Sequence, residues 1–268
     1  MADKVAVLVI HGIGAQEQGF ADGLVERVNA RVARRADATQ VVWQSVLWAD
    51  VLQPRQEKFL RDLRRAEGND IDFIKLREFV ISNIADAAAY QNIRGRKTSA
   101  YAEIHSRVKA SLRELYREKL GGQACPLIVA AHSLGGHIMS NYIWDAQQSK
   151  ARLNAFERME HLAGMFTFGC NIPLFSFALD KMEPIRFPGK ALSRRERARA
   201  KWLNLYDADD VLGYPLGQIN ARYAKLVEDK AVNSGNFLTS WNPLSHNGYW
   251  QDKDVVRPLA GMISDFLP

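Results

Sequence analysis

Short, continuous apolar runs recur along the chain and are separated by longer amphipathic or polar stretches. Runs of this kind, rich in Val, Ile and aromatic residues, are typical of strands that are buried on both faces of a sheet. They predict strands over residues 5–10, 39–48, 125–131, 162–170 and 201–207.

The stretches between these runs place apolar residues at helical intervals. Leu24, Val28 and Val32, for example, fall on one face of a helix. Pro and Asp are common where helices begin, and Gly is common where they end. These signals predict further helices over residues 54–68, 70–90, 99–120 and the stretch that follows Ser133.

Strands and helices alternate along most of the chain. This order predicts an α/β fold with a mostly parallel sheet and helices on both faces, built as a single domain over residues 1–268. Two segments fall outside the alternation, a helical one over residues 50–92 and a Pro-containing one over residues 171–200. Because such inserts often cover the carboxyl edge of a parallel sheet, we expect them to form a lid or cap.

The stretch VAAHSLGGHIM carries a single hydroxyl, Ser133, between a predicted strand and a predicted helix. A serine at the top of a strand–turn–helix is the geometry of a nucleophile elbow, which needs very small neighbours. Ala131, Gly135 and Gly136 meet that need. The alternative interpretation is a serine that only caps the helix. His132 is adjacent to Ser133 on the turn and is not expected to serve as its base.

These motifs resemble those of the α/β-hydrolase superfamily. The likeness is carried by HGIG after the first strand and HSLGG after a later one, and it is nearest to the lipase and esterase branch. It implies that the backbone amides of Ile13 and Leu134 form the oxyanion hole, each worth about 3 kcal/mol of transition-state stabilisation. The glycines of GIG lack the rest of a dinucleotide or P-loop motif, so we expect no cofactor.

A serine nucleophile needs a base, and the chain order in this family is serine, acid, histidine. Among the histidines of the chain, only His246 follows every candidate for the acid. It lies in SWNPLSHNGYW, a polar stretch before the last predicted helix, and is therefore the predicted base. The alternative interpretation is a histidine of an ordinary surface loop.

The acid is expected just past the strand over residues 201–207, in the stretch DADDVLGYPL. Asp207, Asp209 and Asp210 are all candidates. Related hydrolases carry an Asp followed by two residues and then Gly/Ala-Tyr-Pro-Leu, a pattern that favours Asp210 over Asp209 and then Asp207. The remaining carboxylates would cap or turn the loop.

Both inserts contain large apolar residues that could line an acyl pocket. For each residue taken singly, ordinary packing within the lid is the expected role. These residues are Phe73, Ile74, Phe79, Phe175, Phe177 and Met182.

Composition limits the remaining possibilities. The chain is 47% hydrophobic and 25% charged, with a net charge of +6, so it has enough apolar material for a full core. Its one dense basic run, residues 193–201, fits a solvated helix or loop, and we expect no nucleic-acid partner. Ligand spacing such as His-Glu-x-x-His is missing from the sequence, so we expect no metal.

Cys125 and Cys170 form neither a disulfide framework nor a zinc site, which favours buried thiols in a reducing compartment. The apolar run at residues 5–10 is too short for a signal peptide or a membrane span. We therefore expect a cytoplasmic protein without stable membrane insertion.

Together these residues predict a serine hydrolase that cleaves a carboxylic ester through Ser133, His246 and Asp210. The expected substrate is a small-molecule or lipid-like ester with a hydrophobic acyl or alcohol part. A thioesterase or acyltransferase would use the same triad, and a non-catalytic hydrolase-like scaffold is a third possibility.

Overall fold

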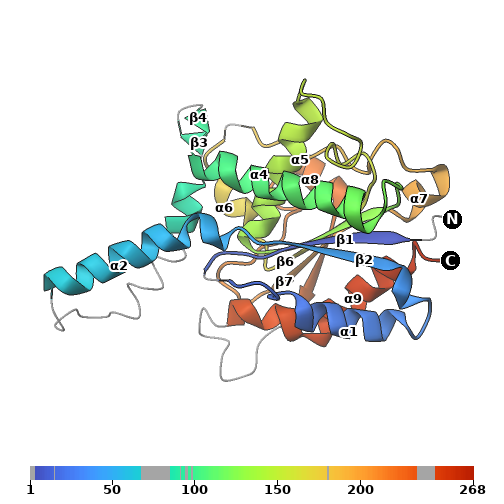
Figure 1. Ribbon diagram of the computed structural model, residues 1–268. Helices are drawn as coiled ribbons and strands as arrows, with labels where there is room; N and C mark the ends of the chain where they lie inside the picture. The colour runs from blue at the N-terminus through green and yellow to red at the C-terminus, as the bar shows by residue number, and fades with distance from the viewer. Residues whose placement is uncertain are drawn as a thin grey trace.

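A parallel sheet forms the centre of the molecule and helices cover both of its faces (Figure 1). The structure is a computed structural model that describes residues 4–14, 16–67, 85–90, 92–93, 96–97, 99–179, 181–233 and 245–268. Within these ranges the main sheet has six strands, and a separate two-stranded sheet pairs β3 (Asn92–Ile93) with β4 (Arg96–Lys97).

The main sheet has the strand order β2-β1-β5-β6-β7-β8, and all neighbouring strands are parallel. The strands β1, β5 and β6 are buried along their whole length, which explains why their sequences are largely apolar. The strands are β1 Val5–Ile10, β2 Val41–Val46, β5 Leu127–His132, β6 Leu162–Phe168, β7 Lys201–Asp207 and β8 Val227–Val232.

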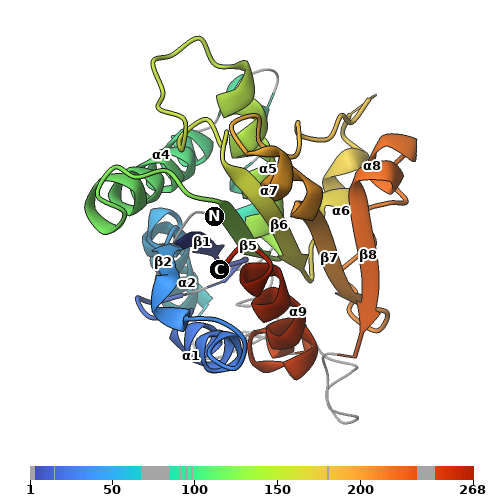
Figure 2. The ribbon, with the colours of Figure 1, turned by 90° about the vertical axis from the view of Figure 1, so that its right-hand side faces the viewer.

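One face of the sheet is covered by α1 (Asp22–Val32) and α9 (Lys253–Ser264), which lie side by side (Figure 2). Leu24, Val28 and Val32 are buried, so the predicted apolar face of α1 is confirmed. The short helix η4 (Ser245–Gln251) precedes α9 and packs against the same core through Tyr249.

The opposite face is covered by α4 (Ser99–Glu114) and α5 (Leu134–Gln148), with α6 (Ile172–Ser176) and α8 (Ala221–Leu226) beside them (Figure 1). A π-helical turn, η3 (Leu115–Lys119), extends α4. Each face therefore has its own hydrophobic core, with the sheet between them.

The five predicted strands are present, with differences at their ends. The strand expected over residues 39–48 is shorter, because Asp37 caps the 3₁₀ turn η1 (Ala38–Gln40) with its carboxylate before β2 begins. Gly121 and Gly122 have positive φ angles of 59° and 77° and end the α4–η3 helix, as predicted.

Strand β8 was not predicted from the sequence. It reads VEDKAV and lies at the edge of the sheet, where most of its side chains are at least partly exposed. An edge strand with charged residues gives no apolar run, and such charges discourage pairing with other chains.

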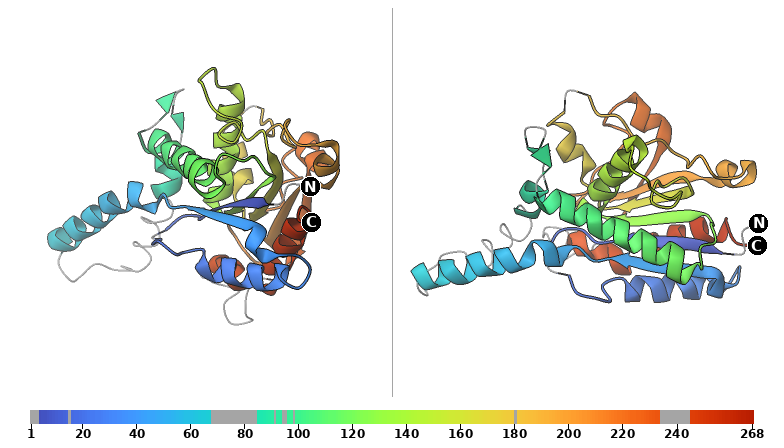
Figure 3. Two further views of the ribbon diagram at one scale, coloured as in Figure 1. Left: turned by 45° about the vertical axis from the view of Figure 1, so that its right-hand side comes forward. Right: turned by 45° about the horizontal axis from the view of Figure 1, so that its top comes forward.

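The insert over residues 50–92 begins with η2 (Ala49–Val51) and α2 (Gln53–Glu67). Helix α2 projects from the end of the sheet where β1 ends (Figure 3). Residues 68–84 lie outside the described residues, and so do the candidate pocket residues Phe73, Ile74 and Phe79; the chain is again helical at residues 85–89.

The insert over residues 171–200 contains α6 and α7 (Arg194–Arg199), with irregular chain between them. The basic run forms α7, which begins with a capping box between Ser193 and Glu196 and has no buried residue, as expected of a solvated helix. A role of the two inserts as a lid stays a prediction. Across the described ranges, no helix combines the length and the apolar character needed to cross a membrane.

Candidate active site

Ser133 lies on a sharp turn between β5 and α5. Its backbone has φ 53° and ψ −125°, a conformation that residues other than Gly rarely adopt. Its N–H donates to the carbonyl of Phe168 over 3.0 Å, which holds the turn against the end of β6. A capping serine has an extended backbone and accepts a hydrogen bond from the first turn, whereas Ser133 makes no such capping bond. The geometry therefore favours the nucleophile elbow over the simple cap.

The loop after β1 lies directly against Ser133. A Cβ atom placed on Gly12 would be 2.6 Å from the Cβ of Ser133 and 3.2 Å from its Oγ. A Cβ placed on Gly135 would be 2.5 Å from the carbonyl oxygen of His11. Only glycine fits at either position, and the two close contacts bring the HGIG loop to the amino end of α5.

His11 fixes the start of this loop and is not a base. Its Nε2 accepts the N–H of Trp48 over 3.1 Å, and its Nδ1 donates to the carbonyl of Gly12 over 2.7 Å. These two bonds require the neutral ring with its proton on Nδ1. Burial lowers the pKa of His11 to about 4, so the ring stays neutral at physiological pH.

Asp86 fixes the end of the loop. This buried carboxylate accepts the N–H of Gly14 over 3.1 Å through Oδ2 and the side-chain amide of Gln56 over 2.6 Å through Oδ1. Burial raises the pKa of Asp86, and the two hydrogen bonds oppose that rise. Sequence reasoning missed Asp86, whose only signal is a lone acidic residue in the small, apolar stretch IADAAAY. The insert thus holds the loop that carries Ile13.

The three candidate acids after β7 differ in environment. Asp209 is exposed, whereas Asp207 and Asp210 are buried. Asp207 Oδ1 accepts the N–H of Asp209 within its own turn. Asp210 accepts the N–H of Leu212 over 2.9 Å through Oδ1 and the hydroxyl of Tyr249 over 3.0 Å through Oδ2. The carboxylate of Asp210 thus has a hydrogen bond to η4.

Helix η4 carries His246 three residues before Tyr249. The imidazole of His246 lies outside the described atoms, so its pairing with Ser133 and with Asp210 stays a prediction. The structure does show the position of η4. The hydroxyl of Tyr249 connects η4 to the end of β7, because this hydroxyl donates to Asp210 and accepts the N–H of Asp207 over 2.8 Å.

An aromatic cluster also joins η4 to the elbow. Trp250 packs on His132, with ring centroids 5.4 Å apart, and on Phe168, at 5.2 Å. Phe20, from the segment before α1, makes T-shaped contacts with Trp250 and His11, with ring centroids 5.6 Å and 5.0 Å apart. Aromatic pairs at these separations are stabilising, so the cluster fixes the backbone of η4 beside the turn at Ser133.

The remaining candidates for chemistry have packing roles. Cys125 and Cys170 are buried free thiols, as predicted, and burial raises their pKa values to about 11 and 12. Among the described residues, His, Cys, Asp and Glu form no group of three or more arranged to hold a metal ion.

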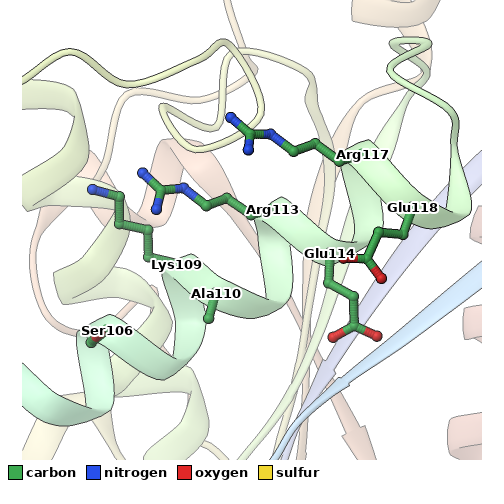
Figure 4. A pocket seen from close by; sticks show the side chains of 7 residues that line it. All are labelled: Ser106, Lys109, Ala110, Arg113, Glu114, Arg117 and Glu118. Carbon is green, nitrogen blue, oxygen red and sulfur yellow. The ribbon is translucent and has the colours of Figure 1, made fainter.

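A hollow on the outer surface of α4 and η3 is a different kind of feature (Figure 4). Lys109, Arg113 and Arg117 lie in a row along it, and Glu114 points away from them. Arg113 pairs with the buried carboxylate of Glu157, while Glu114 accepts the side-chain amide of Gln44. This surface lies away from the carboxyl edge of the sheet, where sites in such folds occur, and is a charged helix face.

No protein-family model matches this chain, and no curated protein does. Solved structures match it at low sequence identity, and three of them are the following. A dienelactone hydrolase from Anabaena variabilis is 13% identical, with a TM-score of 0.41 over 99% of this chain and 86% of that one. The mouse α/β-hydrolase domain-containing protein 10 is 9% identical, with a TM-score of 0.42 over 97% and 88%. Est1E from Butyrivibrio proteoclasticus is 10% identical, with a TM-score of 0.35 over 98% and 87%.

These superpositions are loose. The fold is better recognised from the parallel sheet, the turn at Ser133 and the loop of glycines packed against it.

Proposed function

We propose that this protein, which has the α/β-hydrolase fold, is a serine hydrolase that cleaves a carboxylic ester. The single observation that carries the proposal is the backbone of Ser133, held at a positive φ of 53° between a buried strand and a helix. A buried serine in so unfavourable a conformation costs on the order of 1–3 kcal/mol, and strain of this size is typical of functional sites.

Two further features support the same chemistry. The glycine loop after β1 packs against Ser133, and α5 begins at Leu134, which supports the assignment of the Ile13 and Leu134 amides to the oxyanion hole. The first amides of a helix have no partner within that helix, and its dipole favours negative charge there. Both amides would donate to the oxygen of the tetrahedral intermediate.

In the proposed reaction, His246 takes the proton of the Ser133 hydroxyl as its Oγ attacks the ester carbonyl. The tetrahedral intermediate collapses, the C–O bond to the alcohol breaks, and His246 gives its proton to the departing alcohol. Water, deprotonated by His246, then attacks the acyl-enzyme and releases the acid. Asp210 orients the imidazole and stabilises its charged form.

The test of this proposal is hydrolysis of a p-nitrophenyl ester series by the wild-type protein and by Ser133→Ala. We expect turnover by the wild type, and a loss of about 10⁴-fold or more in kcat for Ser133→Ala and for His246→Ala. Turnover at the wild-type rate by Ser133→Ala would overturn the assignment.

The same triad would serve a thioesterase or an acyltransferase. A non-catalytic scaffold would share the fold but would not turn over an ester. Matched oxygen esters and thioesters, assayed with and without an added alcohol acceptor, separate the two enzymatic alternatives. A buried Asp210 that is hydrogen-bonded to η4 supports an enzyme over a scaffold without catalysis.

A further inference from the structure

Three polar side chains form a row across the sheet, from the strand beside the elbow to the edge strand. Thr167 on β6, Asn204 on β7 and Asp229 on β8 lie opposite one another in the register of these strands, which Figure 2 shows side by side. Ala131, two residues before Ser133, lies opposite Thr167 on β5. Thr167 and Asn204 are fully buried, each between two apolar residues of its strand. Buried polar groups are costly unless they have hydrogen-bond partners.

The hydrogen bonds of this row fix the orientation of the Asn204 amide. Its nitrogen donates to the carbonyl of Tyr214 over 3.0 Å and to Oδ1 of Asp229 over 2.7 Å, and both of these oxygens are acceptors. Its oxygen accepts the hydroxyl of Thr167 over 2.8 Å, and this hydroxyl accepts the indole N–H of Trp202 over 3.2 Å. Donors and acceptors are matched throughout, so the row is held in one arrangement.

Asp229 uses the rest of its carboxylate to hold the backbone of the loop after β7. Its Oδ1 accepts the N–H of Leu216 over 2.9 Å, and its Oδ2 accepts the N–H of Gly217 over 2.7 Å. A Cβ placed on Gly217 would be 2.9 Å from Oδ2, so the loop lies close against the carboxylate. Hydrogen bonds to an ionised carboxylate are stronger than those between neutral groups. Asp229 therefore anchors this loop firmly to β8.

The loop held in this way is the one that carries the candidate acid. The carboxylate of Asp210 lies against Gly213, where an added Cβ would be 2.5 Å from Oδ2. The next residue, Tyr214, donates its N–H to the carbonyl of Cys170 over 3.0 Å, and its own carbonyl accepts the Asn204 amide. The chain therefore has little freedom between the Asp210 carboxylate and the anchor that the row provides.

The other end of the row lies beside the elbow. Cγ2 of Thr167 would be 3.5 Å from a Cβ placed on Gly136, in the first turn of α5. The N–H of Ser133 donates to the carbonyl of Phe168, the residue after Thr167. The same buried row thus contacts the support of the nucleophile and holds the loop of the acid. This matters because a misplacement of about 1 Å in a catalytic group can cost about 10²-fold in rate.

We propose that Asp229 is a positioning residue of the proposed reaction. Through its hydrogen bonds to the loop after β7, it sets the position of the Asp210 carboxylate relative to Ser133. Since the carboxylate of Asp229 is engaged by the loop and by Asn204, it acts through the loop and not on the ester. The inference rests on the proposed function, because it needs Asp210 to act as the acid of the triad.

The test measures the rate at which an excess of an ethyl fluorophosphonate labels Ser133, followed by mass spectrometry. Each chain reacts once, so slow variants remain measurable. In Asp229→Asn the amide nitrogen cannot accept a hydrogen bond, and at least one N–H of the loop loses its partner. We expect this variant to be folded by circular dichroism and to be labelled at least about tenfold more slowly than the wild type.

Combination with Asp210→Asn separates positioning of the acid from a general loss of structure. If Asp229 acts through Asp210, then Asp229→Asn should slow labelling by less than about twofold in the Asp210→Asn background. Damage unrelated to the acid would slow labelling by the same factor in both backgrounds. Glu228→Gln is the matched control, because this exposed neighbour on β8 loses the same charge; it should keep the wild-type rate within about twofold.

Thr167→Val is the second variant and decides the question if Asp229→Asn does not fold. Valine keeps the shape of the threonine side chain but lacks the hydroxyl that orients the Asn204 amide. We expect labelling to slow at least about threefold, again with less than about a twofold effect in the Asp210→Asn background.

The outcomes separate the two proposals. Labelling of Asp229→Asn at the wild-type rate, an equal loss with and without Asp210→Asn, or an equal loss in Glu228→Gln overturns the positioning role and keeps the serine hydrolase. The first two results count in the same way for Thr167→Val. No labelling of Ser133 in the wild-type protein overturns the serine hydrolase, and the role of Asp229 falls with it.

Discussion

The hydroxyl of Tyr249 donates a hydrogen bond to Oδ2 of Asp210 over 3.0 Å, although the two residues lie 39 positions apart. The same hydroxyl accepts the N–H of Asp207 over 2.8 Å. Tyr249 is fully buried, so these bonds are shielded from water. They connect the loop with the candidate acid to the short helix with the candidate base.

Tyr249→Phe should therefore weaken both stability and catalysis. The N–H of Asp207 and one oxygen of Asp210 lose a buried partner, which should lower the free energy of unfolding by about 1–3 kcal/mol. We expect kcat to fall by about 3- to 30-fold, because Asp210 and η4 are less firmly oriented. Urea unfolding and ester turnover measure the two effects. Tyr214→Phe is the control, since the Tyr214 hydroxyl binds the exposed carbonyl of Val211, and it should change neither quantity appreciably.

Asp210→Asn should show whether Asp210 is the triad acid. An amide keeps the shape but cannot stabilise the charged imidazole, and we expect kcat to fall by about 10³- to 10⁴-fold with the fold intact. The exposed Asp209, changed to Asn, should keep kcat within about twofold. Should Asp209→Asn and Asp210→Asn have equal effects on steady-state turnover, the acid would have been assigned to the wrong residue.

Gly12→Ala should displace the loop after β1, which carries the proposed oxyanion donor Ile13. The added methyl would lie 2.6 Å from Cβ of Ser133 and 3.0 Å from Nδ1 of His132, so the loop must move away from the serine. Since a lost oxyanion donor costs about 10²- to 10³-fold in kcat, we expect a loss of that order.

The control for this variant is Gly23→Ala, in the first turn of α1, where a Cβ meets nothing within 4 Å. It should leave kcat unchanged and stabilise the protein by up to about 1 kcal/mol, because alanine is the better helix former. A Gly12→Ala protein with wild-type kcat would contradict the placement of the loop.

Asp86→Asn should lower activity and change the pH dependence of the free energy of unfolding. Asn cannot accept from both Gly14 and Gln56 as the carboxylate does, so the loop is held less firmly and we expect kcat to fall by about tenfold with little change in KM.

The pH dependence of this effect follows from the sign of the shift. Burial raises the pKa of Asp86, so the folded state holds the proton more tightly than the unfolded state. Stability contributed by this group is therefore present at low pH and lost as pH rises from about 4 through the raised pKa. Asp86→Asn does not titrate, so its free energy of unfolding relative to the wild type should increase over that range. A difference that stays constant or decreases with pH in urea titrations would contradict this.

The sequence predicted the parts of the molecule that its local pattern controls. The central strands are largely apolar because both of their faces are covered. Ser133 stands out because it lies between a buried strand and a helix and has very small residues on both sides. The order of serine, acid and histidine that the family resemblance implies reduced the candidate bases to His246 and the candidate acids to a short loop, and these assignments stay predictions.

Other parts depend on contacts between distant residues and could not be predicted. β8 pairs with β7, with Trp202 opposite Val227, but the charged residues of β8 leave no apolar run from which the strand could be predicted. Asp86 matters because it accepts the amide of Gly14, 72 positions away. Tyr249 gave no signal either, since a tyrosine near a predicted helix is ordinary until its partner Asp210 is located.

The most direct test of the central claim is to treat the folded protein with a fluorophosphonate probe and to map the adduct by mass spectrometry. The proposed mechanism predicts one adduct per chain, on Ser133, with labelling at least about 10³-fold slower in His246→Ala. An unmodified Ser133, an adduct on another residue, or equal labelling of His246→Ala and wild type would contradict it.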